Sequence, residues 1–233
     1  MSQPVGVSIL TVTYNAGAFL ESFLESVFAV DQRGVDLEVI VVDNGSSDGT
    51  LDILRGRANR VTLIQNDENN YTRALNLGIA RAHGDFIAIT NNDATVEPGW
   101  LRGALRVFEG RDSIGAVQSK IFFAGQGRLN SVGVEEVEHY YFKDIGFDEE
   151  DTGEFMQAAE RDYVSGGSVM FRRACLEDVG PWDEEFIMFM EDVDYSVRCR
   201  RAGWQLWYAP DSVMHHHYHC LLYTSDAADE EDS

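Results

Sequence analysis

An apolar segment that ends abruptly in two amides and a carboxylate occupies residues 86–93 (FIAITNND). The apolar part is short and is bounded by glycine-containing turns, so we predict a buried strand rather than a helix. Open α/β sheets place their ligands at the carboxyl ends of such strands. Asp93, backed by Asn91 and Asn92, therefore suits a hard cation whose other ligands are phosphates and water. The alternative is a polar turn that caps the next helix.

Two further strand-like segments, residues 7–15 and 37–43, also end in polar side chains. Both ends should lie side by side at the carboxyl edge of the sheet. There Asp43 could accept hydrogen bonds from a ribose hydroxyl or a pyrimidine N–H, and this is the role we expect for it. The alternative is an Asx-turn in which Asp43 or Asn44 caps the loop. For Asp48 we expect a helix-capping role.

Asn70 and Arg73 stand at the start of a helix predicted over residues 72–82. In one interpretation Asn70 is the N-cap and Arg73 is a surface charge. In the other, the planar guanidinium of Arg73 binds a diphosphate. The sequence leaves both interpretations open.

Two acidic residues, Glu191 and Asp192, begin a later helix directly after an apolar run, residues 186–190 (FIMFM). Acidic residues in a first helical turn are ordinary partners of the helix dipole. Attachment to the apolar run predicts partial burial, and a partly buried carboxylate in a cleft is a candidate general base with a raised pKa. Residues 215–219 (HHHYH) then predict one metal ligand, because alternation along a strand lets only some histidines face one site.

The elements that must position these side chains alternate along the first half of the chain. Strand patterns occupy residues 7–12, 37–42, 61–65 and 86–89, and helical patterns occupy residues 18–30, 72–82 and a short stretch from residue 51. This alternation predicts an α/β fold, with a doubly wound, mainly parallel sheet and right-handed crossovers. The second half is less regular, with strands expected at 116–123, 164–171 and 204–208, a helix at 191–202, and a long polar excursion at 125–160.

The composition limits the classes of function. The chain has 233 residues, of which 44% are hydrophobic, and a net charge of −22 from 18 basic and 40 acidic residues. Such an acidic chain is not expected to bind nucleic acid. Three cysteines without paired spacing indicate a reducing compartment, and no apolar run reaches the ~20 residues that span a bilayer. We expect a cytoplasmic protein, with peripheral contact at the inner face of the plasma membrane left open.

Four blocks, in this order and spacing, resemble inverting family 2-type glycosyltransferases of the GT-A fold. The blocks are residues 12–15 (VTYN), 42–50 (VDNGSSDGT), 90–93 (TNND), and 180–186 (GPWDEEF) leading to 191–194 (EDVD). The resemblance covers about residues 5–219. It is greatest to rhamnosyltransferase-like enzymes of bacterial polysaccharide and cell-envelope assembly, which share the pattern of residues 164–173.

The resemblance implies a nucleotide-diphospho-sugar donor, a glycan or lipid-linked acceptor, and Mn²⁺ or Mg²⁺. Asp43 matches the position that binds base and ribose, and Thr11, Thr13 and Asn15 line the same pocket. A cation bridging both phosphates would neutralise the leaving nucleotide diphosphate. The polar excursion at 125–160 would help to choose the acceptor.

Further roles follow from the same resemblance. Asp93 matches the last acid of the family's Asp-x-Asp metal motif, in which Asn91 replaces the first acid. Asp192 matches the catalytic base of a Glu-Asp pair with Glu191. A late histidine commonly completes the metal shell, and His215 fits best, with His216 next.

The expected organisation is one GT-A domain over residues 1–219, with a Rossmann-like nucleotide-sugar-binding half (1–98) and an acceptor half (99–219). Residues 220–233 resemble a translated sequencing adapter, so we expect a disordered acidic tail and a natural C-terminus missing after about residue 219. Two alternatives are a non-catalytic sugar-nucleotide-binding fragment and a sugar-phosphate nucleotidyltransferase. The second should carry a glycine-rich basic loop after the first strand, which residues 13–17 (TYNAG) do not provide.

Overall fold

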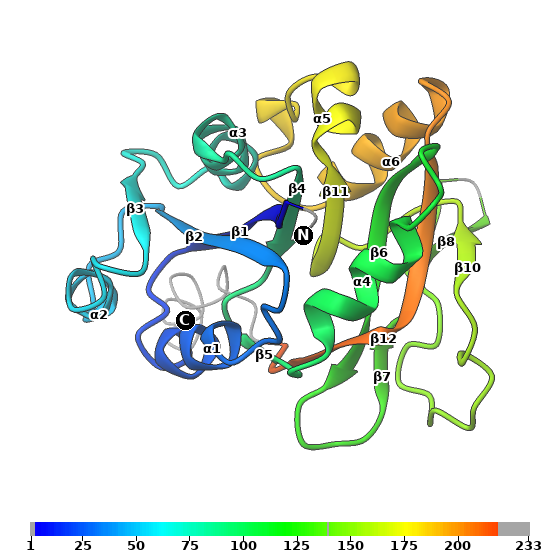
Figure 1. The fold of residues 1–233 in the computed structure, drawn as a ribbon, viewed down its shortest axis with the longest axis horizontal. Helices are drawn as coiled ribbons and strands as arrows, with labels where there is room; N and C mark the ends of the chain where they lie inside the picture. Colours follow the sequence, from blue (N-terminus) through cyan, green and yellow to red (C-terminus); the bar gives the residue numbers. More distant parts are fainter. Residues whose placement is uncertain (1–2, 139, 219–233) are drawn as a thin grey trace, which may run out of the picture.

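The computed structural model describes residues 3–138 and 140–218, so the predicted tail lies outside the described residues. One twisted sheet runs through the described chain in the order β10-β12-β6-β11-β4-β1-β2-β3, with β3 and β10 at opposite edges (Figure 1). Its first half consists of β1 (Val5–Thr13), α1 (Leu20–Phe28), β2 (Val35–Asp43), α2 (Thr50–Arg55), β3 (Thr62–Gln65), α3 (Tyr71–Arg81) and β4 (Phe86–Thr90). These strands pair in parallel, as the alternating pattern predicts.

The second half adds strands of both directions. It consists of β5 (Ala94–Val96), α4 (Trp100–Phe108), β6 (Ile114–Phe123), β7 (Leu129–Ser131), β8 (Val134–Glu138), β9 (Tyr141–Asp144), β10 (Ala159–Arg161), β11 (Ser168–Arg172), α5 (Arg173–Val179), the 3₁₀ helix η1 (Glu184–Phe186), α6 (Glu191–Arg201) and β12 (Gln205–His216). Strand β11 runs antiparallel between β4 and β6, which joins the two halves in one mixed sheet. The sequence predicted neither β5, α4, α5 and η1 nor the strands β7, β8 and β9 inside the polar excursion.

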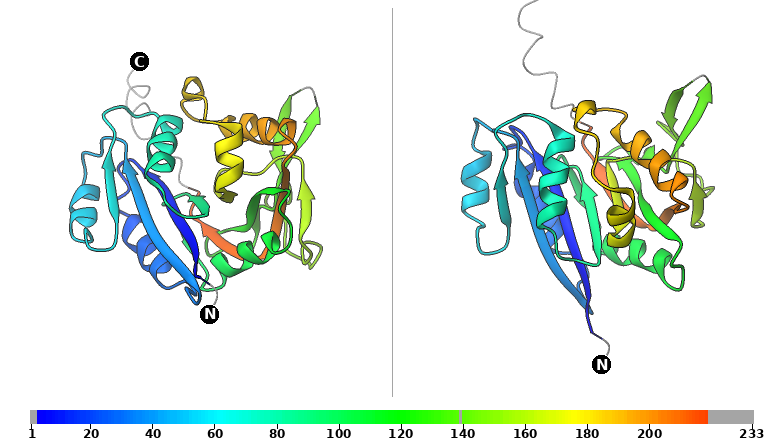
Figure 2. Two further views of the ribbon diagram at one scale, coloured as in Figure 1. Left: turned by 45° about the horizontal axis from the view of Figure 1, so that its top comes forward. Right: turned by 90° about the horizontal axis from the view of Figure 1, so that it is seen from above.

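Helices cover both faces of the sheet and bury two apolar clusters. One cluster lies under α1, α2 and α4, and the other lies under α3, α5 and α6 (Figure 2). The packing of α4 depends on Gly103, because a Cβ there would lie 2.3 Å from the backbone of Asp211. In the second cluster, Cys175 of α5 and Cys199 of α6 are buried with their sulfur atoms 3.6 Å apart.

Strand β12 is longer than the sequence predicts. The expected strand ended at Tyr208, before Pro210, but β12 continues to His216 through an irregularity between Ala209 and Val213. A proline cannot donate to a strand ladder, and it is tolerated where pairing is locally interrupted. The continuation carries His215 and His216 into pairing with β5 and β6. The histidine cluster therefore begins inside the sheet.

The polar excursion at 125–160 forms β7, β9, β8 and the edge strand β10. Its base is fixed by an ion pair between Lys120 and Asp151, whose Nζ and Oδ2 lie 2.6 Å apart. The backbone N–H of Ile145 donates to the carbonyl of Gly133, and the backbone N–H of Val132 donates to that of Ile145. These bonds hold the β8–β9 hairpin against β7, beside the carboxyl end of β6.

Candidate active site

A cavity of about 600 Å³ opens at the carboxyl ends of β1 and β4. Its walls come from both halves of the chain. Most of the polar groups that the sequence singles out lie on it or next to it. The polar residues on its walls include Thr13, Asn91, Asn92, Asp93, Asn130, Asp144, Glu191, Asp192 and His216.

Asp93 and His216 lie together at this cavity. Asp93 is 3% exposed, and its Oδ1 is 3.1 Å from Nε2 of His216. The amide nitrogen of Asn91 lies 3.3 Å from the same Nε2. On the other side of the ring, Nδ1 is 2.8 Å from Oδ1 of Asn130. Because an amide oxygen can only accept, Nδ1 donates its hydrogen to Asn130. Nε2 faces Asp93, and it is the ring nitrogen that would act as a ligand when it carries no hydrogen.

These residues fit a divalent cation. Ligand atoms at roughly 2.1 Å from Mg²⁺, at right angles to each other, lie roughly 3 Å apart, which matches the separation of Asp93 Oδ1 from His216 Nε2. The hydrogen bond from Nδ1 to Asn130 is the outer-shell contact that metal-binding histidines usually make. In residues 3–138 and 140–218, no group of three or more His, Cys, Asp or Glu side chains could hold a metal. Further ligands would have to come from phosphate oxygens and water.

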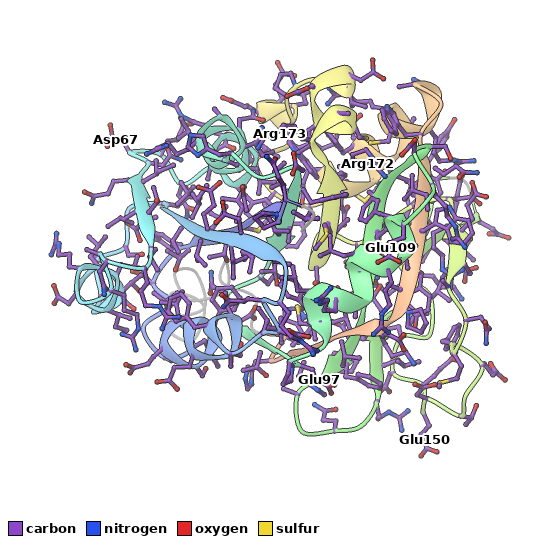
Figure 3. The ribbon with its side chains drawn as sticks, in the orientation of Figure 1. Asp67, Glu97, Glu109, Glu150, Arg172 and Arg173 are labelled. Atoms are coloured by element: carbon purple, nitrogen blue, oxygen red, sulfur yellow. The ribbon has the colours of Figure 1, made fainter. Side chains whose placement is uncertain are left out.

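His215, the histidine that the sequence analysis preferred, lies elsewhere. Neighbouring residues of a strand point to opposite faces, so His215 and His216 cannot both face Asp93. The Nε2 of His215 is 3.1 Å from Oε1 of Glu97, between β5 and α4 (Figure 3), and its ring stacks on Phe122. His216, and not the preferred His215, therefore lies beside Asp93, an arrangement set by a strand register that was not visible in the sequence.

The ends of β1 and β2 carry buried oxygens that have no hydrogen-bond partner among the described residues. Thr13 pairs with Asp43 in the parallel register of β1 and β2, and both residues are fully buried. The unpartnered atoms are Oγ1 of Thr11, Oγ1 of Thr13 and Oδ1 of Asp43. Leaving a buried polar atom without a partner costs stability. Of these three residues Thr13 lines the cavity, whereas Thr11 and Asp43 lie behind it.

Asp43 combines the two interpretations that the sequence left for it. Its Oδ2 accepts hydrogen bonds from the backbone N–H groups of Gly45 at 3.2 Å and Ser46 at 3.0 Å, which forms the Asx-turn. Its Oδ1 is buried, and Asp43 does not itself line the cavity. Asn15 joins the two strand ends, because its Oδ1 accepts from the backbone N–H of Ser47 at 2.8 Å. Asp48 stands one residue before Gly49, the N-cap of α2, and its Oδ1 accepts from the N–H of Thr50, the first residue of that helix.

Asn70 and Arg73 occupy the positions of the structural interpretation. The Oδ1 of Asn70 accepts from the backbone N–H of Arg73 at 3.0 Å, which makes Asn70 the N-cap of α3. The side chain of Arg73 is 45% exposed and pairs with Glu68 at 3.2 Å. Neither residue lines the cavity, whereas the neighbouring Asn69 does.

Glu191 and Asp192 lie on the cavity at the start of α6. Oδ2 of Asp192 accepts from the backbone N–H of Gly166 at 2.9 Å, and burial raises the pKa of Asp192. Burial and then the charge of Asp192 raise the pKa of Glu191 to about 7. The Oε2 of Glu191 is buried without a hydrogen-bond partner in the described chain. The two carboxylates are buried, as was predicted from the apolar run before them. Their pKa values are raised, as those of a proton acceptor are.

Several residues that line the cavity were not predicted from the sequence. Asn130 and Asp144 come from the polar excursion, whose strands carry no clear periodic pattern. The loop of Gly166 and Gly167 was predicted as part of a strand, but it bends past Asp192 before β11 begins. Met188 and Phe189 were seen only as an apolar run, although they line the cavity. No local signal in these segments indicates their position.

Solved structures of low sequence identity share this fold. GalNAc-T7, solved with UDP, GalNAc and Mn²⁺, has a TM-score of 0.77 and 17% identity, over 91% of this chain and 44% of that chain. The mannosyltransferase PcManGT from Pyrobaculum calidifontis, solved with GDP-Man and Mn²⁺, has a TM-score of 0.68 and 19% identity, over 94% of this chain and 59% of that chain. The chain therefore has the GT-A α/β fold.

Sequence comparisons give the family. The profile of glycosyl transferase family 2 matches residues 8–180, and the chain belongs to that family. It is 28% identical to N-acetylglucosaminyl-diphospho-decaprenol L-rhamnosyltransferase of Mycobacterium tuberculosis, over 91% of this chain and 76% of the relative, which assigns it to the rhamnosyltransferase-like branch. It is 30% identical to glucosyl-dolichyl phosphate glucuronosyltransferase of Haloferax volcanii, over 76% of this chain and 56% of the relative.

Proposed function

We propose that this protein transfers a sugar from a nucleotide-diphospho-sugar to a hydroxyl of a glycan or lipid-linked acceptor, with inversion at the anomeric carbon. The observation that carries the proposal is that one cavity is lined by two pairs of functional side chains, a carboxylate with an imidazole and a pair of carboxylates. Asp93 and His216 have the donor atoms of a cation site, and Glu191 and Asp192 have the burial of proton acceptors. Transfer from a nucleotide sugar needs both functions close together.

The nucleotide is proposed to bind at the ends of β1 and β2. Thr11, Thr13 and Asp43 each leave a buried oxygen without a partner in the described chain, as a site for ribose or base would. Asn91 and Asn92 line the cavity next to Asp93, where the diphosphate would follow. Arg73 is left out of the proposal because of its ion pair with Glu68.

Asp93 and His216 are the residues proposed to hold Mn²⁺ or Mg²⁺. Such a cation, when bound, supplies Lewis-acid stabilisation of the negative charge that develops on the leaving diphosphate. Asn91 lies beside this site, and its amide nitrogen, 3.3 Å from Nε2 of His216, would release that contact when Nε2 acts as a ligand. Asn130 fixes the imidazole so that Nε2 faces Asp93.

Asp192 is proposed to be the general base. It would remove the proton of the acceptor hydroxyl as that oxygen attacks the anomeric carbon from the side opposite the leaving group. The hydrogen bond from the N–H of Gly166 to Oδ2 of Asp192 holds the carboxylate at the cavity wall. A positioned base contributes roughly 10²–10⁴-fold to such a reaction. Glu191 is proposed to support Asp192 electrostatically rather than to take the proton.

A lipid-linked saccharide is the proposed acceptor class. The name of the Mycobacterium tuberculosis relative contains a diphospho-decaprenol-linked sugar and an L-rhamnosyl group. In the loop before α6, beside the cavity, Ile187 is 55% exposed and Phe189 is 60% exposed. An exposed apolar loop beside a polar cavity suits a ligand with a polar head and an apolar tail, or contact with a lipid surface. No helix of the described residues is long and apolar enough to cross a membrane.

Ligand-induced stabilisation and product analysis test the proposal. The protein is heated with dTDP-, UDP- and GDP-sugars, each with and without Mn²⁺, and one donor should raise the melting temperature only with the metal. The same donor is then incubated with a polyprenyl-diphosphate-linked N-acetylglucosamine, and the anomeric configuration of the product is determined by NMR. Transfer with inversion supports the proposal. Binding without transfer or hydrolysis would favour a non-catalytic sugar-nucleotide-binding protein, and retention would exclude the proposed mechanism.

A further inference from the structure

Asp144 presents a carboxylate to the cavity that the proposed mechanism does not use. It is the last residue of β9, and it lines the cavity together with Asn130. Its Oδ1 is buried and has no hydrogen-bond partner among residues 3–138 and 140–218. A buried carboxylate oxygen without a donor destabilises the folded chain, so its retention at a cavity wall points to a ligand.

Asp144 lies near one member of each pair of cavity side chains, Asp192 and His216. Burial, followed by the charge of Asp192, raises the pKa of Asp144 to about 6. The hydroxyl of Ser131 and the charge of His216 act in the opposite direction. Asp144 therefore lies within electrostatic reach of the proposed base and of the proposed cation ligand.

Asp144 is not a third ligand of the cation. Within the described ranges, no His, Cys, Asp or Glu side chain lies close enough to Asp93 and His216 to complete a three-residue metal group. A diphosphate is also excluded as its partner, because phosphate oxygens accept hydrogen bonds and repel a carboxylate. A neutral hydrogen-bond donor suits this oxygen, and in a cavity for a sugar donor and a sugar acceptor the most abundant such group is a sugar hydroxyl.

The hairpin that carries Asp144 is held in place. Asp144 pairs with Val134 in the β8–β9 ladder, and the N–H of Val134 donates to the carbonyl of Tyr163. The next residue, Ile145, exchanges backbone hydrogen bonds with Val132 and Gly133. A carboxylate on a fixed hairpin selects by position, which a carboxylate on a loose loop cannot do.

We propose that Asp144 is a specificity-determining residue that accepts a hydrogen bond from a hydroxyl of the bound sugar. The inference rests on the proposed function, and it deepens that function by naming a residue that recognises a sugar. The hydroxyl belongs either to the donor sugar or to the acceptor sugar. Both have the same chemistry, and the experiment separates them.

The experiment compares Asp144→Ala and Asp144→Asn with the wild-type chain and with Glu138→Ala, a change at an exposed site of the same hairpin. Calorimetry with Mn²⁺ measures the affinity for dTDP-L-rhamnose and for dTDP alone, and steady-state kinetics give KM and kcat for the polyprenyl-linked acceptor. Loss of a hydrogen bond to a charged group corresponds to about a 10- to 100-fold weakening. If the hydroxyl belongs to the donor sugar, Asp144→Ala weakens the binding of dTDP-L-rhamnose by this factor and leaves the binding of dTDP unchanged. For an acceptor hydroxyl, donor binding stays constant and the acceptor KM rises by this factor.

Three results would overturn the proposal. Affinities and KM that all stay within about twofold would show that no ligand hydroxyl contacts Asp144. Equal weakening of dTDP and dTDP-L-rhamnose would indicate a structural effect on the nucleotide site. A fall in kcat with KM unchanged would make Asp144 a proton acceptor. Failure of the wild-type chain to bind any nucleotide sugar would instead contradict the proposed function.

A stability measurement keeps the inference testable without a ligand. Asp144→Asn removes a buried charge, so it should raise the melting temperature at pH 7.5 or leave it unchanged. A clear decrease would show that the carboxylate stabilises the hairpin, and the assignment to a ligand would then be wrong.

Discussion

Oδ1 of Asp93 and Nε2 of His216 lie 3.1 Å apart, although 123 residues separate them in the sequence. The antiparallel pairing of β5 with β12 produces this contact, because His216 pairs with Ala94, the residue after Asp93. The backbone N–H of His217 also donates to the carbonyl of Asp93 at 2.8 Å. The end of the chain's last described strand thus completes a site that begins at the end of β4.

This contact predicts that His216→Ala abolishes Mn²⁺-dependent binding of the nucleotide sugar. His215→Ala is the matched control, because His215 faces Glu97 on the other side of β12 and should leave binding unchanged. Calorimetric titration of each variant with donor, in Mn²⁺ and in EDTA, measures the effect. Equal losses for both variants, or a loss confined to His215→Ala, would return the proposed ligand to His215.

Asn130 is expected to act on the cation site through His216. Its Oδ1 receives the hydrogen of Nδ1, so Asn130→Leu should weaken Mn²⁺ binding by about 10–100-fold. Asn130→Asp retains an acceptor at the same place and should restore most of the affinity. Mn²⁺ titration followed by electron paramagnetic resonance gives the affinity without any need for turnover. An unchanged affinity in Asn130→Leu would show that the imidazole is held by other contacts.

Substitutions of Thr13 and of Arg73 form a second pair of variants with opposite expected effects on donor binding. Thr13→Val removes a buried, unpartnered hydroxyl and should weaken donor binding by about two- to tenfold while the fold stays stable. Arg73→Ala should change donor affinity by less than about twofold, since exposed ion pairs contribute little. Thermal shift and calorimetry with the same nucleotide sugar measure both. A loss of more than tenfold in Arg73→Ala would revive its assignment to the diphosphate.

Glu191 should make the stability of the chain depend on pH. Its pKa rises from an ordinary 4.5 to about 7 in the folded state, mainly through burial. The folded chain therefore binds this proton more tightly than the unfolded chain, so the contribution of Glu191 to stability falls as pH rises from about 4.5 to about 7. Glu191→Gln should be stabilised relative to wild type at pH 8 and gain less at pH 5. Urea unfolding at both pH values gives the two differences, and a larger gain at pH 5 would contradict the burial of the carboxylate.

The strand ends of the first half could be predicted because each carries a complete local signal. The apolar run before Asp93 and the run before Asp43 each predict a buried parallel strand, and the carboxyl ends of such strands meet at one edge. The acidic start of α6 was predicted for a similar reason, since its residues follow one another in the sequence. These segments supplied Asp43, Asp93, Glu191 and Asp192 without any knowledge of long-range contacts.

The remaining groups depend on pairings between distant segments. The choice between His215 and His216 is set by the register of β12 after the irregularity at Pro210, and a shift of one residue reverses it. Asn130 and Asp144 reach the cavity because the excursion folds back on β6, an arrangement fixed by contacts such as Lys120 with Asp151. Arg73 is the opposite case. The sequence left open whether it is a surface charge or a diphosphate ligand, and in the structure its guanidinium pairs with the nearby Glu68.

The assignment of Asp192 as the base is tested by measuring turnover and donor affinity of Asp192→Asn. We expect kcat to fall by at least ~10²-fold while calorimetry with Mn²⁺ gives an unchanged affinity for the nucleotide sugar, because only a proton acceptor is lost. Glu191→Gln should lower kcat less than Asp192→Asn does. Wild-type turnover in Asp192→Asn, or a larger loss in Glu191→Gln, would contradict the assignment of Asp192 as the base.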